Sequence, residues 1–410
     1  MSIGTNWAGN YEFGAATLHR PRGLEELQEV VARAPRIRPI GSRHSFSGIA
    51  DSADVVSLEL MPPAIRIDGE SETVSFGAGL RYGDLAPVLQ ASGWALRNLA
   101  SLPHISVAGS IATGTHGSGD RNGTLSRAVS GLEYVLADGS LRSISPVDPE
   151  FDGAVVALGA LGVLHRVTLD LEPTFDVRQD VYEGLTWASL LDNLDAITGR
   201  AYSVSIFTDW SGDDVGKVWL KSVIGDRKPP QSLYGATPVL APRHPLVGMP
   251  TENTTPQGGA PGAWLDRLPH FKLEFTPSNG DELQSEYLVP RQHATDALLA
   301  IRALSDRITP HLHVAELRTM AADSLWLSGA YERDALGIHF TWRKQPEHVL
   351  PLLPVIEEAL APFDARPHWG KLFHEVDRDL YPRLGDFVEL ANRLDPSGKF
   401  RNEFLNHHVF

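Results

Sequence analysis

The 410-residue chain contains no cysteine. Disulfides, thiolate nucleophiles, Cys-ligated zinc, iron–sulfur clusters and a cysteinyl link to a cofactor are therefore excluded. Positive charge is also scarce, because 36 Lys and Arg stand against 51 Asp and Glu, a formal net charge of −15. Such a surface repels a polyanion, so nucleic acid is not expected as a partner. Any chemistry must use His, carboxylates, Lys, Arg or a bound cofactor.

Long hydrophobic runs are missing as well. The longest nearly apolar stretch, Ala154 to Leu164, is far shorter than the ~20 residues that cross a membrane. The first residues lack a basic segment followed by an apolar one. We therefore expect no membrane partner and a cytoplasmic location. The composition, 42% hydrophobic and 21% charged, is that of a globular protein, and the length predicts roughly two to three domains.

The first 175 or so residues combine short predicted strands with helices. Apolar spacing predicts a helix from Leu24 to Val31 and another around Leu85. Strands are predicted at 36–40, 55–60, 73–80 and 163–171. The run 130–141 is typical of a hairpin that turns at Asp138-Gly139. This order of elements indicates an α+β arrangement.

The rest of the chain differs in composition and in its hydrophobic pattern. From Pro229 to Pro269, prolines and glycines are dense and apolar periodicity is weak. A lid or surface excursion fits this pattern, with a merely tolerated insertion as an equal alternative. Beyond it, the pattern predicts a helix at 294–308, strands at 311–320 and 336–344, and a proline-interrupted helix at 348–362.

Two glycine-rich segments could bind an anion. One runs from Pro39 to Ser45 at the end of a strand, where backbone N–H groups and serines can form a nest. The other, from Ser106 to Gly119, carries small residues that let a backbone approach a pyrophosphate. The chain has no P-loop sequence, and the glycines at 77–83 are wrongly spaced for a dinucleotide fingerprint. Each segment alone could be an ordinary turn.

The ordered set of motifs is more specific than its parts. Gly41–Phe46, Val74–Asp84, Asn98–Gly109 and Thr113–Ser118 together resemble the FAD-binding domain of the vanillyl-alcohol-oxidase (PCMH-type) flavoprotein family, and within it the bacterial alditol oxidases. The likeness extends past residue 180, returns at 313–344 and 366–374, and ends at Asp395–Asn402. It implies an α+β, two-domain fold: an FAD-binding domain over 1–175, completed by a returning segment 376–410, and a cap domain over 176–375 built on a large antiparallel sheet.

The resemblance also implies how FAD is held. His44 matches the family histidine that is covalently attached to the flavin, and a neutral imidazole nitrogen can form such a bond. Ala100 matches a small residue beside flavin C4a that leaves room for dioxygen. The other expected FAD contacts are Pro39, Ile40, Gly41, Ser42, Arg43, Ser45, Ser101, Ser106, Gly109, Ser110, Ile111, Ala112, Thr113, His116, Gly162 and Val163.

Two predicted strands carry polar residues on one face. Alternation places Glu316 with Arg318 on the first strand, and His339 with Thr341 on the second. A solvated sheet face would show the same pattern, and Lys371 alone would be a surface lysine. In alditol oxidases, however, the positions that match these five residues and Ser101 surround a bound polyol.

The resemblance therefore implies oxidation of a terminal primary alcohol of an alditol, such as xylitol or sorbitol, to the aldose. Hydride passes to flavin N5, and O2 is reduced to H2O2. Arg318 and Lys371 would stabilise the developing alkoxide, while Glu316, paired with His339, would orient the hydroxyls. The final proton acceptor stays open between these groups.

Two alternatives remain at this point. One is a sugar-1,4-lactone oxidase or dehydrogenase of the same fold; the other is a flavin-free sugar-binding protein. We expect a monomer and no metal, because the pairs His311 with His313 and His407 with His408 have no further ligand at a familiar spacing.

Overall fold

A five-stranded antiparallel sheet organises the first part of the chain. The structure is a computed structural model that describes residues 3–275 and 280–410. Its sheet has the order β4 (Arg66–Asp68), β5 (Thr73–Gly77), β9 (Val163–Asp170), β7 (Val129–Val135) and β8 (Leu141–Ile144). β7 and β8 form the predicted hairpin, and Gly139 in its turn has a φ of 86°, a left-handed conformation that glycine adopts without strain.

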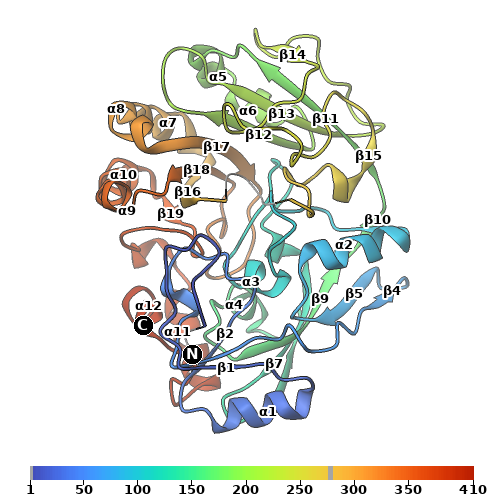
Figure 1. The fold of residues 1–410 in the computed structure, drawn as a ribbon, viewed down its shortest axis with the longest axis vertical. Coiled ribbons are helices and arrows are strands. Elements are labelled where there is room, and N and C mark those ends of the chain that lie inside the picture. The colour runs from blue at the N-terminus through green and yellow to red at the C-terminus, as the bar shows by residue number, and fades with distance from the viewer. Residues whose placement is uncertain (1–2, 276–279) are drawn as a thin grey trace.

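Two smaller sheets and four helices complete this part (Figure 1). β1 (Thr17–His19), β3 (Asp54–Val56) and β2 (Ile37–Pro39) form a parallel sheet, and β6 (Trp94–Ala95) pairs with β10 (Glu172–Pro173). The helices are α1 (Leu24–Arg33), α2 (Tyr82–Ala91), α3 (Val107–Ala112) and α4 (Phe151–Val155). β3 is shorter than the predicted strand 55–60 because the chain turns where the Met61 N–H bonds the Leu58 carbonyl, at 3.1 Å.

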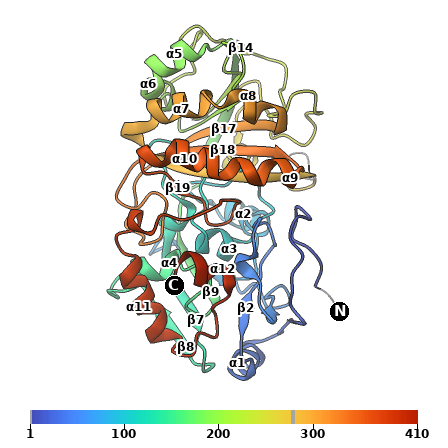
Figure 2. The ribbon, with the colours of Figure 1, turned by 90° about the vertical axis from the view of Figure 1, so that its left-hand side faces the viewer.

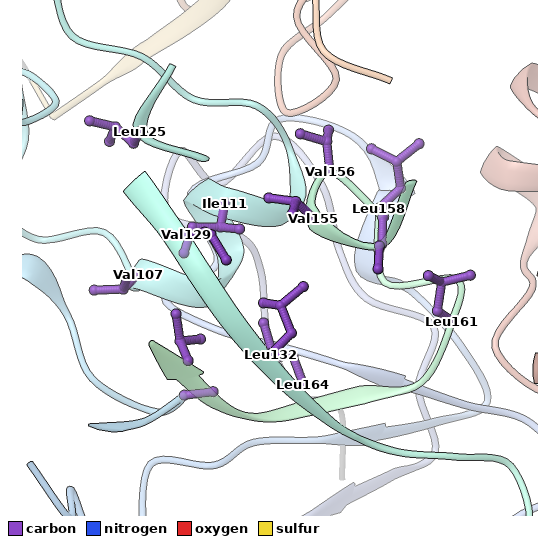
Figure 3. Packing of buried hydrophobic residues seen from close by; sticks show 14 of the residues in the cluster. Val107, Ile111, Leu125, Val129, Leu132, Val155, Val156, Leu158, Leu161 and Leu164 are labelled. Atoms are coloured by element: carbon purple, nitrogen blue, oxygen red, sulfur yellow. The ribbon is translucent and has the colours of Figure 1, made fainter. Parts of the chain in front are cut away.

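The core of this part lies between the sheet and α3 and α4. Val107 and Ile111 sit one turn apart on α3 and point, with Leu132 of β7 and Val155 of α4, into one apolar cluster (Figure 3). All four are almost completely buried. Burying an aliphatic side chain of this size contributes about 1.5–3 kcal/mol.

A nine-stranded sheet occupies the other end of the molecule (Figure 1). Its order is β14 (Thr237–Val239), β11 (Asp176–Glu183), β13 (Lys217–Val223), β12 (Ser203–Thr208), β17 (Leu312–Met320), β18 (Ala335–Arg343), β16 (Glu282–Pro290) and β19 (Arg366–Pro367), with β15 (Gly262–Ala263) beside β11. Its long neighbours pair antiparallel. The α+β arrangement with a large antiparallel sheet is thus confirmed.

Helices cover one face of this sheet (Figure 2). They are α5 (Trp187–Asp192), α6 (Leu194–Thr198), α7 (Ala294–Arg302), α8 (Ser305–Ile308), α9 (Pro346–Val349) and α10 (Leu353–Leu360). The predicted helices at 294–308 and 348–362 are each divided into two. Ala315 and Leu317 of β17 point into the helix-side core. Because side chains alternate, Glu316 and Arg318 point to the opposite face.

The proline-rich excursion covers part of that opposite face. Leu246 and Met249 pack on Val181, Phe207 and Trp219 of the sheet. The excursion also contains β14, β15 and a short 3-10 turn, so it is more ordered than the sequence indicated. This packing favours a cover over the sheet, and not a tolerated insertion.

The chain end returns to the first part of the molecule (Figure 2). α11 (Leu384–Leu394) and α12 (Glu403–His408) lie beside the N-terminal elements. The Lys399 carbonyl accepts the Ile37 N–H at 3.1 Å, and the Asn402 side chain donates to the Gly48 carbonyl at 2.9 Å. In the part of the chain that the structure describes, no helix is long and apolar enough to span a membrane.

Candidate active site

A cavity of about 690 Å³ lies between the five-stranded sheet and the nine-stranded sheet, and residues of both line it. Most of the predicted FAD contacts line it, namely Pro39, Ile40, Gly41, Ser42, Arg43, His44, Ser45, Ala100, Ser101, Ser106, Gly109, Ser110, Ala112, Thr113, His116 and Gly162. Ile111 and Val163 do not. Both side chains are fully buried in the core, because helical spacing on α3 and alternation along β9 turn them away from the cavity.

The two glycine-rich segments lie side by side along this cavity. The Ser106 N–H donates to Ser42 Oγ at 2.9 Å, although the two residues are 64 positions apart. A Cβ at Gly41 would lie 2.3 Å from Ser106 Oγ, and one at Gly79 would lie 2.4 Å from the Leu58 carbonyl. Glycine at these two positions therefore allows a close approach that any side chain would obstruct.

His44 projects from the first glycine-rich turn, and no side chain among the described residues hydrogen-bonds its ring. Neither ring nitrogen is bonded although both are buried, and the ring stacks on Trp7 with centroids 5.3 Å apart. Burial, with a smaller effect of His104, lowers the pKa of His44 to about 4, so the imidazole is neutral at pH 7. Arg43 beside it adopts a left-handed φ of 59°. A buried neutral histidine with free nitrogens in a small-residue cradle fits a covalently held flavin.

The opposite wall is a row of side chains from three adjacent strands. Glu286 on β16 pairs in register with His339 on β18, which pairs with Glu316 on β17. Directly opposed residues in an antiparallel sheet share a face, so all three point toward the cavity, which each of them lines. Glu286 is 1% exposed and was not among the residues that the sequence singled out.

Glu286 is the centre of a buried charge cluster. Its carboxylate accepts from Arg318 Nη2 at 3.0 Å and from Lys371 Nζ at 2.6 Å, and His116 Nε2 lies 3.1 Å away. Burial raises the pKa of Glu286, but Lys371, His116 and Arg318 outweigh it and hold the pKa well below its usual value. The two predicted cationic groups are therefore fixed by one carboxylate.

Lys371 also determines which ring nitrogen of His339 carries the proton. Lys371 Nζ donates to His339 Nδ1 at 2.6 Å, which leaves the Nε2–H to donate to Thr341 Oγ1 at 3.1 Å. Burial and then Lys371 lower the pKa of His339 to about 4. Burial also lowers the pKa of Lys371. The Thr341 hydroxyl, which accepts from His339, keeps its own proton to donate into the cavity.

Glu316 and Ser101 complete the cluster. Arg318 Nη1 donates to Ser101 Oγ at 3.3 Å, and its Nε lies 3.6 Å from Glu316. Glu316 also accepts from His270 Nε2 at 2.7 Å. The structure thus brings together all six predicted substrate-side residues. Arg318 and Lys371 balance Glu286 and Glu316, so the site offers many donors and acceptors without net charge, as an uncharged polyhydroxy molecule requires.

Three residues of this network were not identified from the sequence: Glu286, His270 and Lys221. Lys221 Nζ lies 2.9 Å from His270 Nδ1 and, through it, belongs to the network of Glu316. The signals were a carboxylate in the strand at 282–290 and a lysine in the apolar run 217–223. Buried charges in strands are rare unless they are paired, so either residue could have been flagged.

One group of metal-type ligands occurs in the described residues outside the cavity. Glu375, His407 and His408 place ligand atoms within 4.8 Å of one another near the chain end. Their third member, Glu375, is distant in sequence, which is why spacing did not show it. The carboxylate lies 3.1 Å from His407 Nε2 and 3.4 Å from His408 Nδ1.

Comparisons with known proteins agree with this geometry. A family model described as an FAD-binding domain matches residues 15–145, and one described as D-arabinono-1,4-lactone oxidase matches 279–408. The structure superposes on cholesterol oxidase from B. sterolicum with a TM-score of 0.79 at 16% identity, covering 99% of this chain and 96% of that one. This likeness confirms the PCMH-type fold.

Relatives of known function span the whole chain. An alditol oxidase of Streptomyces sp. (strain IKD472 / FERM P-14339) is 49% identical over 98% of this chain and 97% of its own length. An L-gulono-1,4-lactone dehydrogenase of Mycobacterium tuberculosis is 28% identical, with 98% of both chains covered. L-gulonolactone oxidase of Bos taurus is 26% identical over 98% of this chain and 96% of its own. The chain therefore belongs to the alditol oxidase family of FAD-binding oxidoreductases.

Proposed function

We propose that the protein oxidises a terminal CH2OH group of an alditol such as xylitol or sorbitol to the aldehyde of the aldose. The alcohol loses a hydride and a proton, and O2 takes up both electrons and two protons to give H2O2. The observation that carries this proposal is the cluster of Glu286, Arg318, Lys371 and Glu316, two cations balanced by two carboxylates, opposite the glycine-rich wall. The 49% identical alditol oxidase supports the same substrate class.

The residues of the cluster have separable roles. Arg318 and Lys371 can donate to the reacting hydroxyl oxygen and stabilise its developing negative charge. Glu316 and Thr341 can accept from and donate to the neighbouring hydroxyls, with Ser101 on the other side. The structure restrains the cations through Glu286, so they need little rearrangement during the reaction. FAD, when bound, supplies the hydride acceptor and passes the electrons on to O2.

His44 is the proposed point of covalent flavin attachment. A neutral nitrogen, a position on the cavity lining and the absence of any competing hydrogen bond support it. We expect the denatured protein to keep yellow flavin fluorescence after acid precipitation and gel electrophoresis, and His44→Ala to lose it. Trp7→Phe keeps an aromatic ring against His44 and should retain the band. Wild-type protein that releases all its flavin on denaturation would contradict the assignment.

The function is tested on the purified protein. We expect a flavin absorption spectrum that bleaches when xylitol is added without oxygen, and H2O2 when oxygen is admitted. Failure of xylitol and sorbitol to bleach the flavin would overturn the proposal. A colourless protein that still binds polyols would indicate a sugar-binding protein.

A sugar-1,4-lactone oxidase is the second candidate, because the family model matched at 279–408 carries that activity in its description. Flavin reduction by gulono- or galactono-1,4-lactone at a higher kcat/KM than by xylitol would favour it. The neutral cluster predicts the opposite order, since a lactone presents fewer hydroxyl donors to Glu316. The domain boundaries, the monomeric state and the cytoplasmic location stay predictions.

A further inference from the structure

A second lysine–histidine pair lies behind the substrate cluster. Lys221, on β13, is 1% exposed. Its ammonium group donates to the Leu268 carbonyl at 2.5 Å, the Pro269 carbonyl at 3.1 Å and His270 Nδ1 at 2.9 Å. Each of the three N–H groups of the ammonium therefore has an acceptor, and none of these acceptors is a carboxylate.

This bonding determines which nitrogen of His270 carries the proton. Burial lowers the pKa of Lys221 to about 7, so the ammonium form prevails below that pH. An ammonium can only donate, so in this form His270 Nδ1 accepts and the proton of the neutral imidazole lies on Nε2. That Nε2–H points at Glu316 Oε1, 2.7 Å away, with Ser205 Oγ at 3.3 Å. Burial, followed by Lys221, lowers the pKa of His270 to about 4, so the ring is neutral at pH 7.

The same segment also restrains the other side of the substrate site. The backbone N–H groups of His270 and Phe271 both donate to the Ser101 carbonyl, at 3.0 and 3.3 Å. Phe207 and Trp219 meet the His270 ring edge-on. The two residues that directly follow the proline-rich excursion therefore fix Ser101 through their backbone and Glu316 through the side chain of His270.

We propose that Lys221 and His270 are positioning residues which hold Glu316 as an ionised hydrogen-bond acceptor for the substrate hydroxyls. Lys221 makes His270 a donor at Nε2, and His270 in turn fixes one oxygen of Glu316, so that the other oxygen faces the substrate. Neither residue is proposed to touch the reacting carbon. The proposal rests on the proposed function, since it concerns the polyol site.

The charged groups around Glu316 determine the direction of the expected pH effect. The titratable and charged groups that face it or His270 are Arg318 on the same strand, His339 on β18, Lys371 beyond it, and Lys221 on β13. Burial raises the pKa of Glu316, but Arg318 and His270 outweigh it and keep the pKa below its usual range. Removing the His270 donor therefore raises the pKa of Glu316. Glu316 is then protonated at a higher pH, and polyol binding is lost at that higher pH.

The first test needs no substrate. In holoenzyme labelled with 15N-histidine, two-bond 1H–15N spectra at about pH 6 should show His270 as the neutral Nε2–H form, identified by its loss in His270→Gln. In Lys221→Met the cation is gone, so the pKa of His270 should rise by about one unit or more. Gln179→Met is the matched control, because Gln179 is fully buried and pairs with Lys221 across the sheet but bonds the Thr255 carbonyl. It should leave the pKa of His270 unchanged.

The second test measures polyol binding and flavin reduction separately by anaerobic stopped flow. In His270→Ala we expect the xylitol Kd to rise about tenfold, the loss of one hydrogen bond to a charged group, with a smaller change in the limiting rate of reduction. The acid limb of the Kd profile should move up by about one pH unit. His270→Gln keeps an N–H donor near Nε2 and should restore most of the binding.

These outcomes separate the two proposals. An unchanged Kd and acid limb in a folded His270→Ala, or a control variant that behaves like Lys221→Met, would overturn the positioning role. A His270 that is protonated in the wild type would also overturn it. If xylitol fails to reduce the wild-type flavin, the proposed function fails, and the histidine spectra still decide the proton arrangement.

Discussion

The two walls of the cavity are built from different parts of the polypeptide. The glycine-rich wall consists of turns and small residues, where Gly41 and Gly79 leave no room for a Cβ. The sheet wall consists of charged side chains on adjacent strands, centred on Glu286. A backbone wall can follow the outline of a large rigid group, whereas a side-chain wall places donors and acceptors at chosen points.

This difference indicates how sensitive each wall is to substitution. In the sheet wall, four charged groups balance, so removing one leaves one buried charge uncompensated. In the glycine-rich wall, substitution of a glycine or an alanine removes no charge, and the effect of a larger side chain depends on the space that it fills. Substitutions in the sheet wall should therefore have the larger effects on alcohol oxidation.

The largest effect is expected for Lys371→Met. Met conserves the length of the side chain but removes the donor that bonds Glu286 and His339 and faces the cavity. Loss of one such donor slows a reaction by about 10²–10³-fold, and we expect anaerobic flavin reduction by xylitol to slow by this factor while the flavin spectrum persists. Lys217→Met is the control, since Lys217 is a half-buried lysine of β13 that bonds the Pro245 carbonyl. Near-normal reduction in Lys371→Met would remove the lysine from the mechanism.

Glu286→Gln should have the next largest effect, about 10²-fold on kcat/KM, which corresponds to about 2.7 kcal/mol. Glu286 opposes the effect of burial on Lys371, so its loss lowers the pKa of Lys371 further. If the ammonium form is the active one, the alkaline limb of the rate profile moves to lower pH. The measurement is the pH dependence of flavin reduction.

Glu282→Gln serves as the control for this prediction. Glu282 is equally buried on the same strand, four residues earlier, and accepts from the Gln284 amide. An alkaline limb that stays in place in Glu286→Gln but moves in Glu282→Gln would show that the cluster is not organised by Glu286.

The same contrast explains what the sequence could predict. The glycine-rich wall is built from contiguous motifs, so its residues were recognisable; the side chains of Ile111 and Val163 lie in the core, which leaves only their backbone to face FAD, and that contact stays a prediction. Periodicity already indicates a buried side chain at Ile111, since it repeats Val107 at helical spacing. The sheet wall depends on strand register, which places Glu286 opposite His339. No local pattern encodes that pairing, nor the fold of the excursion that brings His270 to Glu316.

The smallest effect is expected in the glycine-rich wall, for Ala100→Val. Ala100 lines the cavity and is 6% exposed, so two added methyl groups must occupy cavity space. Its match to the small residue beside flavin C4a predicts slower access of O2 to the reduced flavin, by about tenfold, or about 1.4 kcal/mol. Reoxidation by O2 is measured by stopped flow, and reduction by xylitol should change little. Ala100→Gly, which enlarges the space, should react with O2 at least as fast as the wild type. A Val variant with unchanged reoxidation, or one that loses reduction and reoxidation together, would show that this wall does not control oxygen separately from the alcohol.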